Sequence, residues 1–101
     1  MKCLLLITCL LTLPIQAETR FTVRFTATVD QNPAYRPVDW EVWSLEQKGL
    51  IRKIADRWSW SDLLPAGHYR VRAVMNAVQR EMTFSVEQEK QDFIVDFGGI
   101  A

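Results

Sequence analysis

Polarity alternates at every second position along much of this 101-residue chain, and no other feature of the sequence restricts its fold as strongly. From Phe21 to Val29, apolar side chains at the odd positions alternate with threonine and arginine at the even positions. Successive side chains of a β-strand point to opposite faces. The pattern therefore predicts a strand with one buried and one solvent-facing side.

The same alternation predicts further strands later in the chain, over Val38–Trp43, Tyr69–Met75, Met82–Val86 and Phe93–Phe97. Trp43 falls on the polar side of its strand. The segments between them contain proline, glycine and asparagine, which are typical of loops and turns: Asp30–Pro37, Glu46–Gly49, Leu63–His68 and Asn76–Ala77.

The segment Leu50–Trp58 fits two structures. Ile51, Ile54, Ala55 and Trp58 recur at helical spacing, whereas every second residue from Leu50 to Trp58 would share one face of a strand. We expect a strand, because a four-residue turn after a strand suits an antiparallel partner. A short helix packed on the sheet is the alternative.

Six or seven short strands at intervals of about ten residues, each with an apolar face, predict an all-β fold. The expected architecture is a small antiparallel two-layer β-sandwich of the immunoglobulin-like or prealbumin-like kind.

The N-terminus has the features of a secretory signal peptide. Lys2 supplies a positive charge, Cys3–Leu13 is almost wholly apolar, and Ala17 provides a small residue before Glu18. The apolar run is shorter than the roughly 20 residues that span a bilayer. We expect cleavage after Ala17, a periplasmic or secreted protein, and no membrane insertion after cleavage. Lipidation of Cys9 is the alternative, because Leu6–Cys9 has the outline of a lipobox.

Cleavage would leave residues 18–101 as a single domain with eleven basic and twelve acidic residues. This balance gives no electrostatic preference for nucleic acid. The domain would contain no cysteine, so its stability must come from packing. Four tryptophans, five phenylalanines and two tyrosines are the natural source of that packing.

One stretch of sequence is similar to a known group of domains. Leu64-Pro65-Ala66-Gly67-His68-Tyr69-Arg70-Val71-Arg72-Ala73, followed by Phe84–Glu87 and Val95–Gly99, resembles the small bacterial carboxypeptidase-regulatory-like and transthyretin-like sandwich domains. The resemblance implies a non-catalytic accessory or adhesion-type module.

The residues give little support for catalysis or for a cofactor. His68 is the only histidine, and no Gly-x-Ser-x-Gly motif surrounds any serine. Asp39 and Glu41 share a strand face, where carboxylates usually serve solubility. Zinc needs several cysteine or histidine ligands, and Asp30–Asn32 is the only loop that offers clustered oxygens for calcium. We expect no enzyme, no metal and no cofactor.

Two groups of residues are candidates for binding. Trp58 and Trp60 would lie on one side of an extended segment about 7 Å apart, with Trp43 and Tyr35 nearby, as in a row of aromatic rings that stacks on sugars. The alternative is that Trp58 and Trp60 cap the core at the end of the sheet. Arg70 and Arg72 lie on an outward face, and tryptophan, tyrosine and arginine are enriched at protein interfaces. We expect a module that binds another envelope protein. A carbohydrate-binding module that uses exposed tryptophans is the alternative.

Overall fold

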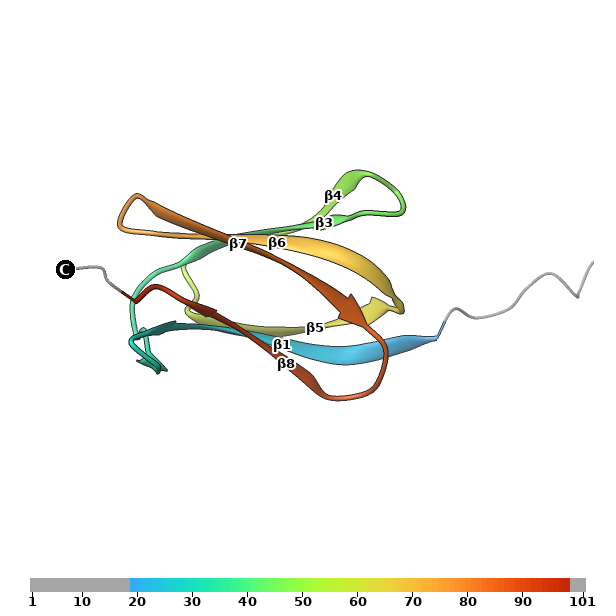
Figure 1. Ribbon diagram of the computed structural model, residues 1–101, viewed down its shortest axis with the longest axis horizontal. Helices are drawn as coiled ribbons and strands as arrows, with labels where there is room; N and C mark the ends of the chain where they lie inside the picture. Colours follow the sequence, from blue (N-terminus) through green and yellow to red (C-terminus); the bar gives the residue numbers. More distant parts are fainter. Residues whose placement is uncertain (1–18, 99–101) are drawn as a thin grey trace, which may run out of the picture.

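The computed structural model describes residues 19–98, which contain eight strands and no helix. The expected signal peptide, its cleavage site and Cys9 lie outside the described residues. The strands are β1 (Arg20–Val29), β2 (Asn32–Pro33), β3 (Asp39–Ser44), β4 (Gly49–Ile54), β5 (Ser59–Pro65), β6 (Gly67–Met75), β7 (Val78–Val86) and β8 (Gln91–Asp96). They form two layers (Figure 1), which confirms the all-β sandwich.

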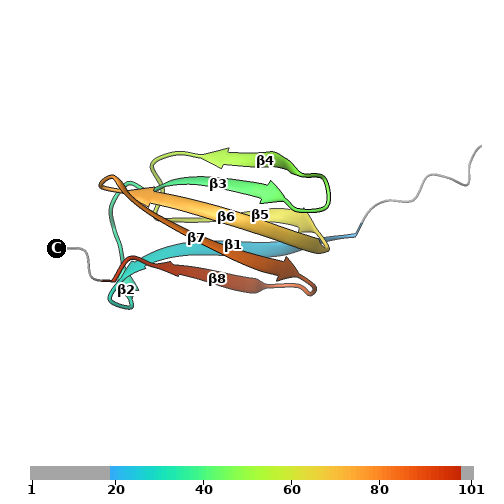
Figure 2. The ribbon, with the colours of Figure 1, turned by 45° about the horizontal axis from the view of Figure 1, so that its top comes forward.

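The first layer, sheet A, is built around β1. Strand β5 pairs antiparallel with β1 along one edge, from the register of Arg20 with Pro65 to that of Thr26 with Ser59. Strand β8 pairs with β1 in parallel, and β2 adds a two-residue antiparallel bridge near the end of β1. The parallel pair joins the first and last strands of the domain, which run in the same direction (Figure 2).

The second layer, sheet B, has the strand order β4-β3-β6-β7 and is antiparallel throughout. Odd-numbered residues of β1 and even-numbered residues of β3 point inward, as the alternation predicts. A bulge between Val42 and Trp43 shifts the register of β4, so that Leu50 lies opposite Trp43.

Aromatic rings fill the space between the sheets. Phe25, which is fully buried, stacks on Trp60 with ring centroids 4.5 Å apart and contacts the rings of Trp40, Phe84 and Phe93. The indole N–H of Trp40 donates a hydrogen bond of 2.6 Å to the carbonyl oxygen of Arg57. This cluster supplies the packing that a domain without disulfides requires.

The ambiguous segment Leu50–Trp58 is a strand in its first part only. Strand β4 ends at Ile54, and residues 55–58 form the connection to β5. The hairpin turn before it and the turn at Asn76–Ala77 are where the sequence indicates. The loop Asp30–Pro37 contains the short strand β2, which the two prolines did not exclude.

The expected turn over Leu63–His68 is wrong. Leu63, Leu64 and Pro65 belong to β5, Gly67 and His68 belong to β6, and only Ala66 lies between the strands. Pro65 occupies the last position of β5, where its register with Arg20 directs its nitrogen away from β1. A proline there costs no ladder hydrogen bond, which is why it does not end the strand earlier.

Candidate functional site

Three of the residues that the sequence suggested for binding meet on the outer face of sheet B. Trp43 is on β3, and its register partner on β6 is Arg70, while Arg72 lies one outward position further along β6. The inner side of the same strands carries Trp40, Val42 and Val71, which are fully buried. Burial of this inner side fixes the outward direction of Trp43 and both arginines.

Both arginines lie over the indole of Trp43. The guanidinium carbon of Arg70 is 4.7 Å from the ring centroid, and that of Arg72 is 5.2 Å away. Such cation–π contacts are worth about 0.5–1 kcal/mol each at exposed sites. We call Trp43, Arg70 and Arg72 the Trp43 cluster.

The two arginines differ in their other partners. Arg72 forms an ion pair with Glu41, which lies opposite it on β3. The Nε atom of Arg70 is buried and has no hydrogen-bond partner among the described residues. Arg70 therefore has donor capacity that this part of the chain does not satisfy.

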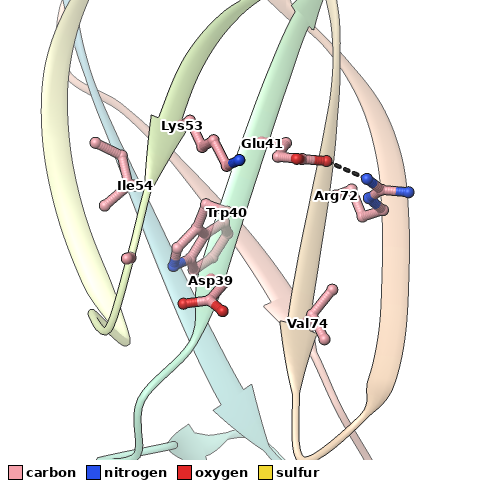
Figure 3. Close-up of a pocket in the computed structure, with 8 residues that line it drawn as sticks. Asp39, Trp40, Glu41, Lys53, Ile54, Arg72 and Val74 are labelled. Atoms are coloured by element: carbon pink, nitrogen blue, oxygen red, sulfur yellow. Dashed lines mark hydrogen bonds and ion pairs between the residues drawn. The ribbon is translucent and has the colours of Figure 1, made fainter.

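A pocket of about 270 Å³ adjoins the Trp43 cluster. Figure 3 shows the Glu41–Arg72 pair on one side of it, while Lys53 of the edge strand β4 reaches over β3 toward Glu41. Asp39, Ile54 and Val74 complete the lining together with Trp40 and Ala55. The surface around the cluster thus combines charged groups of both signs with an apolar floor.

The remaining aromatic candidates do not form one continuous row. Tyr35 is 72% exposed and contacts the half-buried Trp58 edge to face, with centroids 4.9 Å apart. Trp60 is only 6% exposed because it stacks on Phe25 in the core. Trp60 therefore belongs to the core, as the alternative to an exposed row of aromatic rings predicts.

The catalytic candidates have structural partners. The Nδ1 atom of His68 lies 2.7 Å from Glu46 Oε2, and the backbone N–H of His68 also donates to this carboxylate. These hydrogen bonds lower the pKa of Glu46. Within residues 19–98, the imidazole of His68 is hydrogen-bonded to Glu46 and to no serine hydroxyl.

The loop that offered oxygens for calcium is tied to β8. Gln31 donates its backbone N–H to Asp96, and Asn32 bonds the carbonyl oxygen of Asp30. The part of the chain that the structure describes contains no group of three histidine, cysteine, aspartate or glutamate side chains placed to hold a metal ion.

Sequence reasoning missed Glu41 and Lys53 as members of this surface. Glu41 was considered only as a partner of Asp39, yet its ionic partner is Arg72, and Asp39 instead accepts the backbone N–H of Asp56. The alternation places Glu41 and Arg72 on outward faces, but only the pairing of β3 with β6 brings them together.

Comparison of the sequence with known protein families finds no matching family, and no curated protein matches it. The resemblance to transthyretin-like domains therefore stays a prediction. Between residues 19 and 98 there is no helix with the length and apolar character needed to cross a membrane.

Proposed function

We propose that this chain is an exported, non-catalytic β-sandwich module that binds another protein of the cell envelope through the Trp43 cluster. The signal-like sequence of residues 1–17 supports export to the periplasm or the medium. The observation that carries the proposal is the arrangement of Trp43 under two arginines on the outward face of sheet B.

The chemistry of this cluster suits a protein partner. Tryptophan and arginine are the side chains that most often dominate the energetics of protein interfaces. Here the cation–π contacts and the ion pair of Arg72 with Glu41 hold them in place, so that little side-chain freedom is lost on binding. The guanidinium group of Arg70 forms no ion pair among the described residues, so a carboxylate of the partner would match its positive charge, which favours an acidic patch on that protein.

The same geometry supports polysaccharide binding less well. Stacking on a sugar requires an open aromatic ring, whereas two guanidinium groups lie over the ring of Trp43 and Trp60 is in the core. Tyr35 is the aromatic residue with an exposed ring among residues 19–98, and it lies in the loop after β2. One exposed tyrosine is a small platform for a sugar chain.

The test is co-purification from an envelope extract with the wild-type protein, Trp43→Ala and Tyr35→Ala. Each variant removes one aromatic ring, so the second is a matched control for the first. We expect a protein partner that is retained by wild type and by Tyr35→Ala and lost with Trp43→Ala. Thermal unfolding of both variants checks that they fold.

Two results would contradict the proposal. One is a protein partner whose recovery does not depend on Trp43. The other is retention on a polysaccharide column that Tyr35→Ala abolishes and Trp43→Ala leaves unchanged, which would favour the carbohydrate-binding alternative.

A further inference from the structure

The direction of the backbone groups on the free edge of β5 follows from the hydrogen bonds on its paired edge. The N–H of Ala27 donates to the carbonyl oxygen of Trp58 at 2.7 Å. Hydrogen-bonded pairs alternate along an antiparallel ladder. The register of β1 with β5 then directs the N–H and C=O groups of Ser59, Ser61 and Leu63 away from β1.

Side chains form hydrogen bonds with the backbone groups at only one end of this free edge. The N–H of Leu63 donates to Asp62 Oδ1 at 2.7 Å, and its carbonyl oxygen accepts a hydrogen bond from Arg52, which is itself paired with Asp62. Among the described residues, no side chain bonds the backbone of Ser59 or Ser61 in this way. Their N–H and C=O groups are the open part of the edge, and an open edge is a template for another strand.

A groove of about 470 Å³ lies beside this open part, between β5 and the end of β4. Its lining includes Arg57, Trp60 and the strand residue Ser61. The indole N–H of Trp60 is buried and has no acceptor in the described part of the chain. Buried polar groups nearly always have a hydrogen-bond partner. An acceptor supplied by a bound molecule would satisfy this one.

The charged residues that line the groove are Lys53, Arg57 and Asp62. The carboxylate of Asp62 is already paired with Arg52, so the unpaired charge is positive. Arg57 is exposed, and its guanidinium group forms no ion pair with any residue between 19 and 98. Among residues 19–98, neither the guanidinium group of Arg57 nor the indole of Trp60 has a hydrogen-bond acceptor. A fitting occupant therefore supplies carbonyl or carboxylate oxygens.

We propose that an extended, acidic segment of a protein partner adds to sheet A along Ser59 and Ser61 of β5. Its backbone would pair with the open N–H and C=O groups, and an acidic side chain would lie in the groove near Arg57. Addition of a strand to a sheet edge is a common mode of peptide recognition. The groove shares Lys53, Ile54 and Ala55 with the pocket beside the Trp43 cluster, but it includes no residue of the cluster itself. Each proposal is tested by its own variants, so either can fail without the other.

The experiment uses the protein expressed from its full sequence and labelled with ¹⁵N. The ligands are synthetic seven-residue peptides in which valine alternates with glutamate, and the panel includes peptides that begin with valine and peptides that begin with glutamate. We expect chemical-shift changes centred on the amides of Ser59 and Ser61 and on the Trp60 indole. Replacing glutamate by glutamine in the peptides should weaken binding about tenfold, as loss of a charged hydrogen bond does.

Two variants separate strand addition from nonspecific attraction. Ser61→Pro removes an outward N–H without breaking the ladder to β1, and should abolish binding. Leu63→Pro is its matched control, because that N–H is already bonded to Asp62. Arg57→Gln should weaken binding of the glutamate peptides alone, whereas Lys48→Asn removes the same charge from the β3–β4 turn and should have no effect.

Three outcomes would overturn the proposal. The first is the absence of shifts at Ser61 for every peptide of the panel. The second is equal binding by Ser61→Pro and Leu63→Pro, and the third is broadening of the β5 amides with protein concentration alone. That last result would assign the edge to a second copy of this chain.

Discussion

At the scale of single residues, Asp96 joins the last strand to the end of β1 and to the turn that follows β1. Its carboxylate accepts hydrogen bonds from the Thr28 hydroxyl at 2.6 Å and from the backbone N–H groups of Gln31 and Gly98 at 2.9 Å. These hydrogen bonds favour the charged form and lower the pKa of Asp96 below its ordinary value of 3.8.

A group whose pKa is lowered by folding contributes stability above its unfolded pKa, and this contribution is lost as the pH falls through the folded pKa. We therefore expect Asp96→Asn to be less stable than wild type at neutral pH and to lose less stability on acidification below the ordinary pKa of 3.8. Urea unfolding across this pH range measures both effects. Glu46→Gln should change in the same direction, since the pKa of Glu46 is also lowered, through its hydrogen bonds with His68. Parallel pH profiles for wild type and Asp96→Asn would contradict this role.

At the scale of elements, the β6–β7 hairpin contains a strained turn. Asn76 and Ala77 have φ angles of 49° and 66°, in the left-handed region that two-residue hairpin turns use. Asparagine tolerates this region, whereas alanine has a Cβ that disfavours it. The sequence Asn-Ala thus departs from the favoured Asn-Gly at one position.

Ala77→Gly should raise the free energy of unfolding by about 1 kcal/mol, because it relieves this strain. Ala66→Gly provides the comparison, since Ala66 connects β5 to β6 without a positive φ angle. That change should lower stability by about 0.5–1 kcal/mol through the added freedom of the unfolded chain. Urea denaturation of both variants measures these changes. If both substitutions changed the free energy of unfolding in the same direction, the φ angle of the replaced alanine would not explain their effects.

At the scale of the whole molecule, two sheets are held together by one aromatic cluster. Phe25 on β1 contacts rings from β3, β5, β7 and β8, so it links sheet A to sheet B. Where β4 and β5 form the edges of the two sheets, the ion pair of Arg52 with Asp62 connects the layers. Its Nε and Oδ2 atoms are 2.5 Å apart. Both side chains of this pair are partly exposed, and such pairs contribute about 0–1 kcal/mol.

Phe25→Ala should therefore lower the free energy of unfolding by about 3–5 kcal/mol, a large part of what a small domain has. Arg52→Met, which breaks the ion pair, should cost about 1 kcal/mol or less. Denaturant unfolding followed by tryptophan fluorescence compares the two. A similar cost for both would mean that the aromatic cluster does not dominate stability.

The sequence by itself determined strands such as β1, β3 and β6, together with their inward and outward faces. In β1, β3 and β6 the apolar residues recur at every second position. Because successive side chains of a strand point to opposite faces, this period is visible within a short segment of sequence. The segment Ser59–Pro65 does not show the pattern of a strand along its whole length, because Leu63, Leu64 and Pro65 interrupt the alternation and proline is typical of turns. Only its pairing with β1 showed that it is a strand whose proline faces a free edge.

Only the tertiary structure decided which strands are neighbours, and the candidate sites depend on that. Trp60 has a serine on either side, which marks it as one apolar position of its segment, but only the packing of the sheets shows that it stacks on Phe25 in the core. Arg70 and Arg72 contact Trp43 from a neighbouring strand. Arg52 likewise donates a hydrogen bond to Leu63 from a different strand. Local periodicity fixes the face on which a side chain lies, whereas its contacts arise from pairing between segments that are distant along the chain.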